Sequence, residues 1–462
     1  MREIIPNSLY ALAKACPAPL YVIGGSVRDY LAKLSPCPTK QGSPAAKDWD
    51  ICAPLSADSF SALATANGFF VKSVYRNTGT VKLKDENGVD YEYSCFRSDK
   101  YVRGEHVPIE IHFTDDITLD AKRRDFTANA VYYDIANEKY VDPLGGIPAI
   151  QEKRFTTVAP ADKVFGEDGL RLMRLARQAA QLGFTPDNDC IFGATKNAAL
   201  IQDISPERIY TELSLLLSAD TKYGNEQGPY QGLLLLEKTG VLDFIFPELT
   251  LGRNMAQRAD FHAYDVLHHS LRSVLYADKE IRLAALLHDV GKPACMLREG
   301  NSHDHPIVGA ELTQKILLRL KAPKKVCEHV CELVRYHMYD FDCQAKESKL
   351  RRFFIEHNGI LQDLFKLKQA DFSACKDDVS KAPTVQKWED VLQRMQAENV
   401  PFTLRELACT GKDLLEIGIQ PSLLSNVLKE LLLHTALFPK ENEKARLGRL
   451  ALGFAKSLSE QK

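Results

Sequence analysis

Two aspartates separated by one residue are the first candidates for chemistry in this sequence. Asp48 and Asp50 flank Trp49 at the start of a run that favours a β-strand. Residues two apart on a strand point to the same side, so both carboxylates face one way and Trp49 faces the other. Such a pair can hold one or two Mg²⁺ ions against a triphosphate. An isolated Asp-x-Asp arises by chance roughly once or twice in a chain of this length, so the assignment needs further motifs.

A glycine pair stands ahead of these aspartates, where an apolar strand is predicted to turn into a helix. Gly24 and Gly25 follow the run LYVI and precede Arg28. Because glycine has no side chain, the N–H groups of such a turn can approach a phosphate, and a helix N-terminus favours the same charge. The spacing indicates a phosphate-binding turn, with Arg28 placed to reach the same anion. Glu92, on a predicted neighbouring strand, is a candidate third catalytic carboxylate, and a solvated strand face explains it equally well.

Charged residues further along the chain indicate how a base can be chosen. Asp168 and Arg171 are predicted to share one helix face, which Arg174 and Arg177 continue. An aspartate accepts a hydrogen bond from an exocyclic amino group, and an arginine donates one to the adjacent ring nitrogen. Cytosine and adenine present that pair of groups, whereas uracil and guanine present a carbonyl and a ring N–H. The pattern predicts selection of C and A, and the alternative is an intrahelical salt bridge within a basic stripe.

A histidine-rich segment is the second candidate site. Eight of the 12 histidines lie between His262 and His337, where random scatter would place about two. The segment includes the run ALLHDVGK around His288 and Asp289. Imidazole and carboxylate ligands together suit Mn, Fe, Ni, Co or Mg and disfavour a structural zinc site. We therefore expect a metal or acid/base site in this segment.

The elements that must position these residues change type once along the chain. Up to about residue 158, short β-branched and aromatic runs are mixed with helices, and from about residue 163 the apolar residues recur with the helical period. This pattern predicts an α+β fold in which a small mixed-sheet head precedes all-helical modules. With 462 residues, 45% apolar and 26% charged, the chain is expected to form about three globular domains, which excludes a disordered or fibrous protein.

Charge and cysteine content narrow the protein class further. Because 59 basic and 61 acidic residues give a net charge of −2, a nucleic-acid partner has to be bound by local basic faces. Eleven scattered cysteines predict reduced thiols in a cytoplasmic protein rather than a disulfide scaffold. Lys14, Pro17 and Pro19 interrupt the N-terminal segment, so it is not expected to be a signal peptide. No uncharged apolar run is long enough to predict a membrane span.

The motifs between about residues 20 and 250 resemble, in their order, those of the bacterial-type (class II) CCA tRNA nucleotidyltransferase and poly(A) polymerase family. They are GGSVRD, DWD, YEYSCFR, RRDFTANA, DPLGG, FGEDGLRLMRLARQAAQLGF and ISPERIYTEL. The resemblance implies a nucleotidyltransferase head that uses Mg²⁺, ATP and CTP. It also implies a neck helix that reads the incoming nucleotide, and helical body and tail domains that hold tRNA.

The resemblance also implies roles for individual residues. Asp48 and Asp50 would hold Mg²⁺, and the glycine turn with Arg28 would contact the triphosphate. Arg124 would hold the nucleotide with Asp125 near its ribose, although their surroundings also fit a solvated basic turn. The residues that would read the base are Asp168 and Arg171, and those that would support the phosphates are Arg174 and Arg177.

The histidine-rich segment resembles the HD superfamily of metal phosphohydrolases, because Val-Gly-Lys follows His288-Asp289. By motif position, one metal would be ligated by His269, His288, Asp289 and Asp371, and a second site could be completed by His305 and His337. One alternative is that the domain binds no metal and serves as a helical body that holds RNA. The histidines expected at the plain surface are His262, His268, His303 and His329.

These observations predict a nucleotidyltransferase head (1–160), a helical neck or tRNA-binding domain (161–255), an HD domain (256–378) and a helical tail (379–462). The leading hypothesis is an enzyme that adds CMP and AMP to the 3′ end of tRNA. Three alternatives stay open: a poly(A) polymerase, an enzyme that adds only CC or only A, and an HD phosphohydrolase or cyclic phosphodiesterase as the main activity. The C-terminal run lacks the long basic arm that binding of unstructured RNA would favour. One departure from the family is Gly169, at a position where proline is more usual, which should loosen the helix start.

Overall fold

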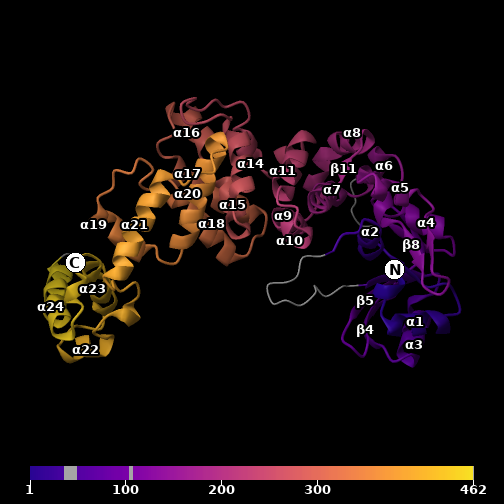
Figure 1. Cartoon of the computed structure of the whole chain (residues 1–462), viewed down its shortest axis with the longest axis horizontal. Helices are drawn as coiled ribbons and strands as arrows, with labels where there is room; N and C mark the ends of the chain where they lie inside the picture. Colours follow the sequence, from indigo (N-terminus) through magenta and orange to yellow (C-terminus); the bar gives the residue numbers. More distant parts are fainter. Residues whose placement is uncertain (36–48, 103–107, 461–462) are drawn as a thin grey trace. The chain divides into compact units, whose positions relative to one another are not determined.

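The computed structural model describes residues 1–35, 49–102 and 108–460. Contacts between residues divide the chain into two compact units, residues 1–250 with 319–322, and residues 251–318 with 323–462 (Figure 1). The first unit combines a sheet with helices and the second is helical, so the predicted α+β class is confirmed. The finer division into four domains stays a prediction.

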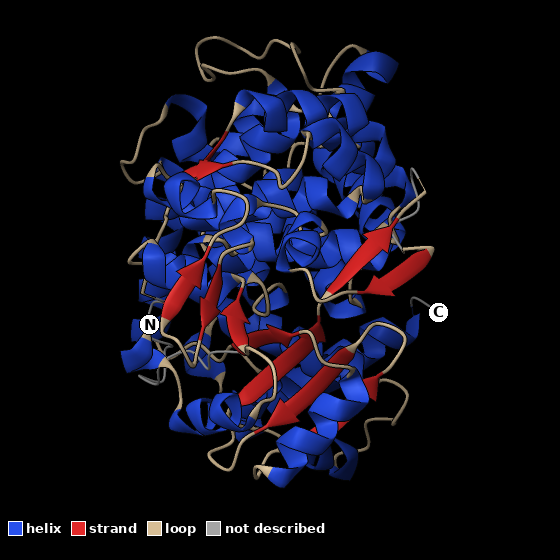
Figure 2. Cartoon of the chain, turned by 90° about the vertical axis from the view of Figure 1, so that its right-hand side faces the viewer, coloured by secondary structure: helices blue, strands red, loops and turns tan. Residues whose placement is uncertain are grey.

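A seven-stranded mixed sheet forms the head, with the strand order β3-β4-β5-β2-β1-β8-β9. Strands β2 and β5 run parallel, and the other neighbouring pairs are antiparallel. Figure 2 shows these strands in red. Val81 and Leu83 are buried while Lys82 between them is exposed, so one sheet face packs on the core and the other meets solvent. The strands are β1 (Tyr21–Ile23), β2 (Trp49–Ala53), β3 (Phe70–Tyr75), β4 (Thr80–Lys84), β5 (Asp90–Cys95), β8 (Tyr132–Asp134) and β9 (Lys139–Val141).

Helix α3 (Ala57–Ala66) packs on the sheet, and helix α2 (Gly25–Leu31) follows strand β1. Helix α3 packs on β3 and β4, and Phe60 stacks on Tyr93 with ring centroids 3.6 Å apart. Helix α2 begins directly after β1, which confirms the predicted strand-to-helix turn. The other elements of the head are α1 (Asn7–Ala15), the pair β6 (Arg97–Lys100) and β7 (Glu110–Phe113), α4 (Ile117–Lys122), the 3₁₀ helix η2 (Thr127–Asn129), α5 (Gly146–Gln151), and β10 (Arg154–Phe155), which pairs with β11 (Thr185–Pro186).

Helix α7 (Leu170–Leu182) is the central helix of the helical part of this unit. It packs against α9 and α11, and it ends at Gly183, whose positive φ of 65° closes the helix in the left-handed conformation. The neighbouring helices are α6 (Ala161–Glu167), α8 (Asn188–Asn197), the 3₁₀ helix η3 (Ala198–Asp203), α9 (Pro206–Leu217), α10 (Asp220–Tyr223), α11 (Gly228–Lys238), α12 (Val241–Ile245) and α13 (Pro247–Thr250).

Gly169 precedes α7 because the backbone of another segment lies directly against it. A Cβ atom at this position would stand 2.4 Å from the carbonyl oxygen of Leu200 in η3, far inside van der Waals contact. Gly169 has an ordinary helical conformation, with φ −60° and ψ −20°, so space rather than backbone geometry requires glycine here. The structure thus gives a steric reason for glycine at this position, and the expectation that Gly169 loosens the helix start stays a prediction.

The second unit is built from helices around α14 (Val266–Tyr276) and α20 (Leu361–Lys376), which pack against each other and against α15 (Arg282–Leu287). Trp388 on α21 (Pro383–Ala397) is fully buried among the aromatic rings of Tyr339, Phe353, Phe354 and Phe365. The remaining helices are α16 (Lys292–Glu299), α17 (His305–Arg319), α18 (Lys324–Tyr336), α19 (Glu347–Glu356), α22 (Gly411–Glu416), α23 (Leu424–Leu437) and α24 (Lys444–Glu460), with the 3₁₀ helices η4 (Lys279–Ile281), η5 (Leu404–Glu406) and η6 (Pro439–Glu441). Among the described residues, no helix has both the length and the apolarity that a membrane crossing needs.

Candidate active sites

The head sheet places two of the predicted carboxylates side by side. Asp50 of β2 and Glu92 of β5 are direct partners in the parallel register, and both are exposed. Trp49 and Ile51 are buried, so the predicted orientation of the strand is confirmed at these positions. Asp48 lies outside the described residues, and its role stays a prediction. The observed pair presents two carboxylates on one solvent-facing surface, which is the arrangement that divalent-metal binding needs.

The glycine turn lies against this surface. Gly24 has a positive φ of 75°, and a Cβ atom there would stand 3.1 Å from Oδ2 of Asp50, so backbone conformation and close approach both favour glycine. On the other side, Lys82 of β4 lies opposite Glu92, with Nζ 3.5 Å from its carboxylate. Sequence reasoning missed Lys82, because a lysine in a half-exposed strand carries no distinguishing signal.

Arg28 belongs to a buried polar network rather than to the exposed surface. Its Nη1 donates to Oδ1 of Asn129 at 2.7 Å and to Oε1 of Gln178 at 3.1 Å, and its Nη2 donates to Asp29 at 2.7 Å. These bonds join α2 to the 3₁₀ helix η2 and to α7. Arg28 thus ties the glycine turn to the neck helix, and contact with a triphosphate stays a prediction. Asn129 and Gln178 were not predicted, since amides in such positions are common.

Asp125 anchors the same network from the other end. Burial would raise the pKa of this carboxyl, but ion pairing with Arg174 and a hydrogen bond from Asn129 hold it well below its usual range. Arg174 donates from Nε to Asp125 at 2.8 Å, and Arg177 binds Glu212 of α9. Both arginines predicted to support phosphates therefore have protein carboxylate partners, which fix their side chains against the helix.

Arg124 lies inside a charged cluster of the head. Its Nη2 is 3.1 Å from Oδ2 of Asp120, its guanidinium lies over the Tyr132 ring, and Arg123 binds the other carboxylate oxygen at 2.7 Å. Asp120 is completely buried, yet Arg124 and Arg123 overcome the effect of burial and lower its pKa to about 2. The alternative of a solvated basic turn is therefore wrong. Contact between Arg124 and a nucleotide stays a prediction.

Asp168 and Arg171 are arranged differently from the expected shared helix face. Asp168 has an extended backbone, with φ −147°, and separates α6 from α7; its Oδ1 accepts the N–H of Leu170 at 2.9 Å. Arg171 is buried, and its guanidinium donates to the carbonyls of Val164 and Arg123 and to Glu167. The ion-pair partner of Arg171 that the described structure shows is thus Glu167, not Asp168. One continuous helix through Asp168 was a wrong expectation, because its side chain caps α7 and breaks the helix there.

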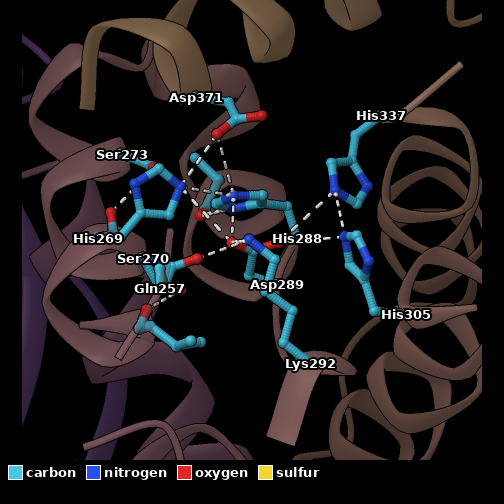
Figure 3. Close-up of polar contacts among 12 residues, drawn as sticks. Gln257, His269, Ser270, Ser273, His288, Asp289, Lys292, His305, His337 and Asp371 are labelled. Atoms are coloured by element: carbon cyan, nitrogen blue, oxygen red, sulfur yellow. Dashed lines mark hydrogen bonds and ion pairs between the residues drawn. The ribbon is translucent and has the colours of Figure 1, made fainter. Parts of the chain in front are cut away.

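All six predicted HD residues come together in the second unit, within one cluster drawn in Figure 3. Three helices and the turns after α15 and α18 supply them, and five of the six side chains are almost completely buried. The members are His269 (α14), His288 and Asp289 (after α15), His305 (α17), His337 (after α18) and Asp371 (α20).

Asp289 lies between two groups of ligands. Its Oδ2 is 3.6 Å from Nε2 of His269 and 3.3 Å from Nε2 of His288. Its Oδ1 is 3.3 Å from Nε2 of His305 and 3.7 Å from Nε2 of His337. The Asp289 carboxylate therefore faces two pairs of imidazoles. Asp371 lies beside the pair formed by His269 and His288, with its Oδ1 3.0 Å from Nε2 of His269. This arrangement can hold two cations with Asp289 between them.

The histidine tautomers favour metal binding. Nδ1 of His288 lies 2.8 Å from the carbonyl oxygen of Ala285, and Nδ1 of His337 lies 2.7 Å from that of Val334. Nδ1 of His305 makes the same kind of contact with Ser302 at 2.6 Å. A carbonyl only accepts, so Nδ1 carries a proton and Nε2 is the nitrogen that faces the cluster and can bind a cation. These residues fit a bound cation.

The charges of the cluster residues lead to the same conclusion. Burial alone would lower the pKa of His288, but Asp289 and Asp371 raise it to about 10. Burial lowers the pKa of His337 to about 4. The carboxyls of Asp289 and Asp371 are held well below their usual pKa range by the imidazoles around them. A proton thus occupies a position that a divalent cation would fill, so metal binding would displace it.

A cavity of about 690 Å³ opens onto this cluster. Nζ of Lys292 lies 2.6 Å from Oδ2 of Asp289 and donates to Gln257 at 2.8 Å (Figure 3). Lys368 also lines the cavity, and its Nζ donates to the carbonyl of His337 at 2.8 Å. The cavity wall therefore places two lysine ammonium groups beside the ligand cluster. Lys292 belongs to the HDVGK run, but the sequence alone predicted no role for it.

Family models match three stretches of the chain. They are the poly(A) polymerase head domain over residues 20–156, the probable RNA and SrmB-binding site of polymerase A over residues 183–251, and the HD domain over residues 261–365. The first match contains the carboxylate pair and the glycine turn, and the third contains five of the six HD residues; Asp371 lies just beyond it.

Relatives and solved structures give a consistent picture. The A-adding tRNA nucleotidyltransferase of Deinococcus radiodurans is 32% identical over 373 residues, covering 77% of this chain and 76% of the relative. The multifunctional CCA protein of Neisseria meningitidis is 32% identical over 332 residues, covering 69% and 72%. The crystal structure of the Bacillus stearothermophilus CCA-adding enzyme in complex with CTP has a similar fold, with a TM-score of 0.65, 22% identity and coverage of 99% and 100%. The chain belongs to the tRNA nucleotidyltransferase and poly(A) polymerase family and is a nucleotidyltransferase that carries an HD domain.

Proposed function

We propose that this enzyme adds CMP and AMP, taken from CTP and ATP, to the 3′ end of tRNA in the cytoplasm. The observation that carries the proposal is the register of Asp50 with Glu92 on the exposed sheet face, beside a glycine turn. The names of the relatives, A-adding and multifunctional CCA enzymes, support tRNA as the acceptor. The unpaired thiols among the described cysteines support a reducing compartment.

The head residues divide the work of transfer between alignment and charge stabilisation. Asp50, with Asp48, would hold Mg²⁺, which when bound supplies positive charge at the reacting phosphate. The glycine turn brings backbone N–H groups to the same surface. Because the protein makes no covalent bond to the nucleotide, the rate depends on the positions of these groups, and the Arg28 network fixes the turn against α7.

Base choice would rest on Asp168 and Arg171 at the start of α7. Three bonds, to Val164, Glu167 and Arg123, hold the guanidinium of Arg171. A guanidinium has five N–H groups, so donors remain for a ring nitrogen while the side chain is held in place. Asp168 would accept from the amino group of cytosine or adenine. Both side chains are oriented before the nucleotide arrives, which favours discrimination.

The product is decided by one experiment. Purified enzyme is incubated with tRNAs that end before the first C, before the second C and before the terminal A, each with a single nucleotide triphosphate. The proposal predicts CMP addition to the first two tRNAs and AMP addition to the third. Addition of AMP alone would show an A-adding enzyme, addition of CMP alone a CC-adding enzyme, and long A tracts on unstructured RNA a poly(A) polymerase.

A second activity is favoured by the ligand cluster of the HD domain. We propose that its six residues bind divalent transition metal such as Mn, Ni, Co or Fe and that the domain hydrolyses phosphoesters. The support is the position of Asp289 between two pairs of imidazoles. The test is hydrolysis of a phosphomonoester and a 2′,3′-cyclic nucleotide by metal-loaded protein. If neither is cleaved with any of these metals, the domain serves as a helical body.

A further inference from the structure

A third group of ligand atoms adjoins the HD cluster, and two of its three members have no role in either proposed activity. His262, His269 and Cys375 each offer one nitrogen or sulfur atom, and these atoms lie within 4.8 Å of one another. His262 was expected at the plain surface, but it is half-buried and lines the cavity together with Cys375. The surface expectation is therefore wrong for His262, whereas His303 is exposed as expected.

Each of the two histidines of this group carries a ring nitrogen without a hydrogen-bond partner among the described residues. Nδ1 of His262 and Nδ1 of His269 are both buried, and neither has a hydrogen-bond partner among the described residues. The other nitrogen of His269, Nε2, faces His288 and Asp371 in the HD cluster. Since His269 is completely buried, an unsatisfied nitrogen on its ring is costly unless something binds it. The orphan nitrogens therefore point to an absent ligand.

The backbone around His262 is fixed to the end of α20, so the group is pre-formed. The N–H of Ala263 donates to the carbonyl of Cys375 at 2.8 Å, and Nζ of Lys376 donates to the carbonyl of Asp260 at 2.6 Å. Tyr264 adds a bond to Asp377. Three consecutive residues at the C-terminal end of α20 thus hold the segment 260–264, which contains His262 and precedes α14. Such clamping is what a metal site requires of its ligands.

We propose that His262, His269 and Cys375 bind a thiophilic divalent cation, such as Zn²⁺, at the mouth of the cavity beside the HD cluster. Two imidazoles and a thiolate suit a tetrahedral ion whose fourth position is open to the cavity. The HD cluster offers only imidazole and carboxylate, which suits harder ions. On binding, the Cys375 thiol loses its proton to solvent and the sulfur forms a bond to the metal. A His269 ring that also ligates a cation of the HD cluster through Nε2 must release its Nδ1 proton to solvent as well, and no electron is transferred. His269 is shared, so a soft metal at this site would change the ligation of its neighbour.

The thiolate gives the test a signature that is separate from activity. The full-length protein is freed of metal and titrated with Co²⁺, and its absorption spectrum is recorded. We expect a near-ultraviolet band of thiolate-to-cobalt charge transfer, lost in Cys375→Ser while visible absorption from cobalt in the HD cluster remains. Competition with Zn²⁺ should show affinity weakened by about tenfold or more in His262→Gln.

A second cysteine provides the matched control. Cys331 is also half-buried in this unit and lies one turn from Cys327 on α18. Cys331→Ser should keep the charge-transfer band. If the wild-type protein shows no such band at saturating Co²⁺, or if Cys375→Ser retains it, the proposal is wrong. Circular dichroism of each variant checks that loss of the band does not come from loss of fold.

Discussion

The head and the HD domain prepare their ligands in opposite ways. In the head, Asp50 and Glu92 stand on an exposed strand face, while the arginines nearby are held by protein carboxylates. In the HD domain, imidazoles and carboxylates face one another in a buried cluster. An exposed pair leaves room for a triphosphate and an RNA end to complete the site. A buried cluster is complete without substrate, because its ligands come from the protein alone.

Because of this difference, we expect the largest loss of transfer activity from substitution of Asp50. Asp50→Ala removes half of the described carboxylate pair. We expect the activation free energy of transfer to rise by several kcal/mol, which lowers the rate by about three decades. Binding of tRNA should stay nearly intact, since the carboxylate serves metal rather than RNA. The control is Asp90→Ala, two residues before Glu92 on the same strand, which should retain activity. Near-normal single-turnover rates in Asp50→Ala would overturn the assignment of the head.

The charged cluster of the head predicts a pH dependence of stability. The pKa of Asp120 is lowered to about 2 from an ordinary value of 3.8, so its stabilising effect is complete above 3.8 and is lost as the pH falls toward 2. The shift corresponds to about 2 kcal/mol.

Denaturant unfolding at about pH 6 and about pH 3 measures about half of this effect, because pH 3 lies between the two pKa values. Asp120→Asn should reduce the stability difference between the two conditions, and the exposed neighbour Asp115→Asn should not. Equal pH dependence in both variants would show that the cluster contributes no linked proton.

The choice among the four nucleotides tests whether Asp168 and Arg171, at the start of α7, read the base. Asp168→Ala should reduce the incorporation of CTP and of ATP alike. It should also reduce the preference for these nucleotides over UTP and GTP by roughly one to two decades, because one polar contact is worth about 1–3 kcal/mol. Glu167→Gln is the matched control, since it keeps an acceptor for Arg171 at its present contact. Incorporation of all four nucleotides by each variant decides the matter. If Asp168→Ala only loses stability and its preference is unchanged, the residue is a helix cap alone.

The smallest expected effect is that of the HD cluster on nucleotide addition. His288→Ala combined with Asp289→Ala should remove bound transition metal, measured by elemental analysis, and leave addition unchanged. The two sites lie in different compact units, which is the reason for this expectation. A folded double variant with collapsed addition would show that the two regions do not act separately.

Local periodicity was sufficient to predict several parts of the site. Strand alternation predicted that Asp50 faces away from Trp49, and Glu92 was a candidate on a neighbouring strand; the structure pairs the two carboxylates. The glycine turn followed β1 as expected. The HD residues were carried over by motif position from the resemblance to the HD superfamily, although 102 residues separate His269 from Asp371. The predictions for the head held because they depend on residue type and on the period of one element at a time.

Other parts depend on contacts that no local pattern encodes. Asp168 ends one helix and caps the next, although the run around it has a helical period throughout. Arg124 is drawn inward by the buried Asp120, which sequence reasoning did not single out. Cys375 gained its place beside His262 through a backbone hydrogen bond between distant segments. Each case turns on a partner that only the folded chain brings near.

The contact between Gly169 and the carbonyl of Leu200 carries a consequence for how this enzyme can vary. A distance of 2.4 Å from a Cβ atom means that any larger residue at position 169 requires the backbone around residue 200 to move. The two positions therefore have to change together, so a substitution harmless in a relative with a displaced η3 segment would be harmful here. Transplanting the neck sequence between relatives should succeed only when residues 198–203 are carried along with it.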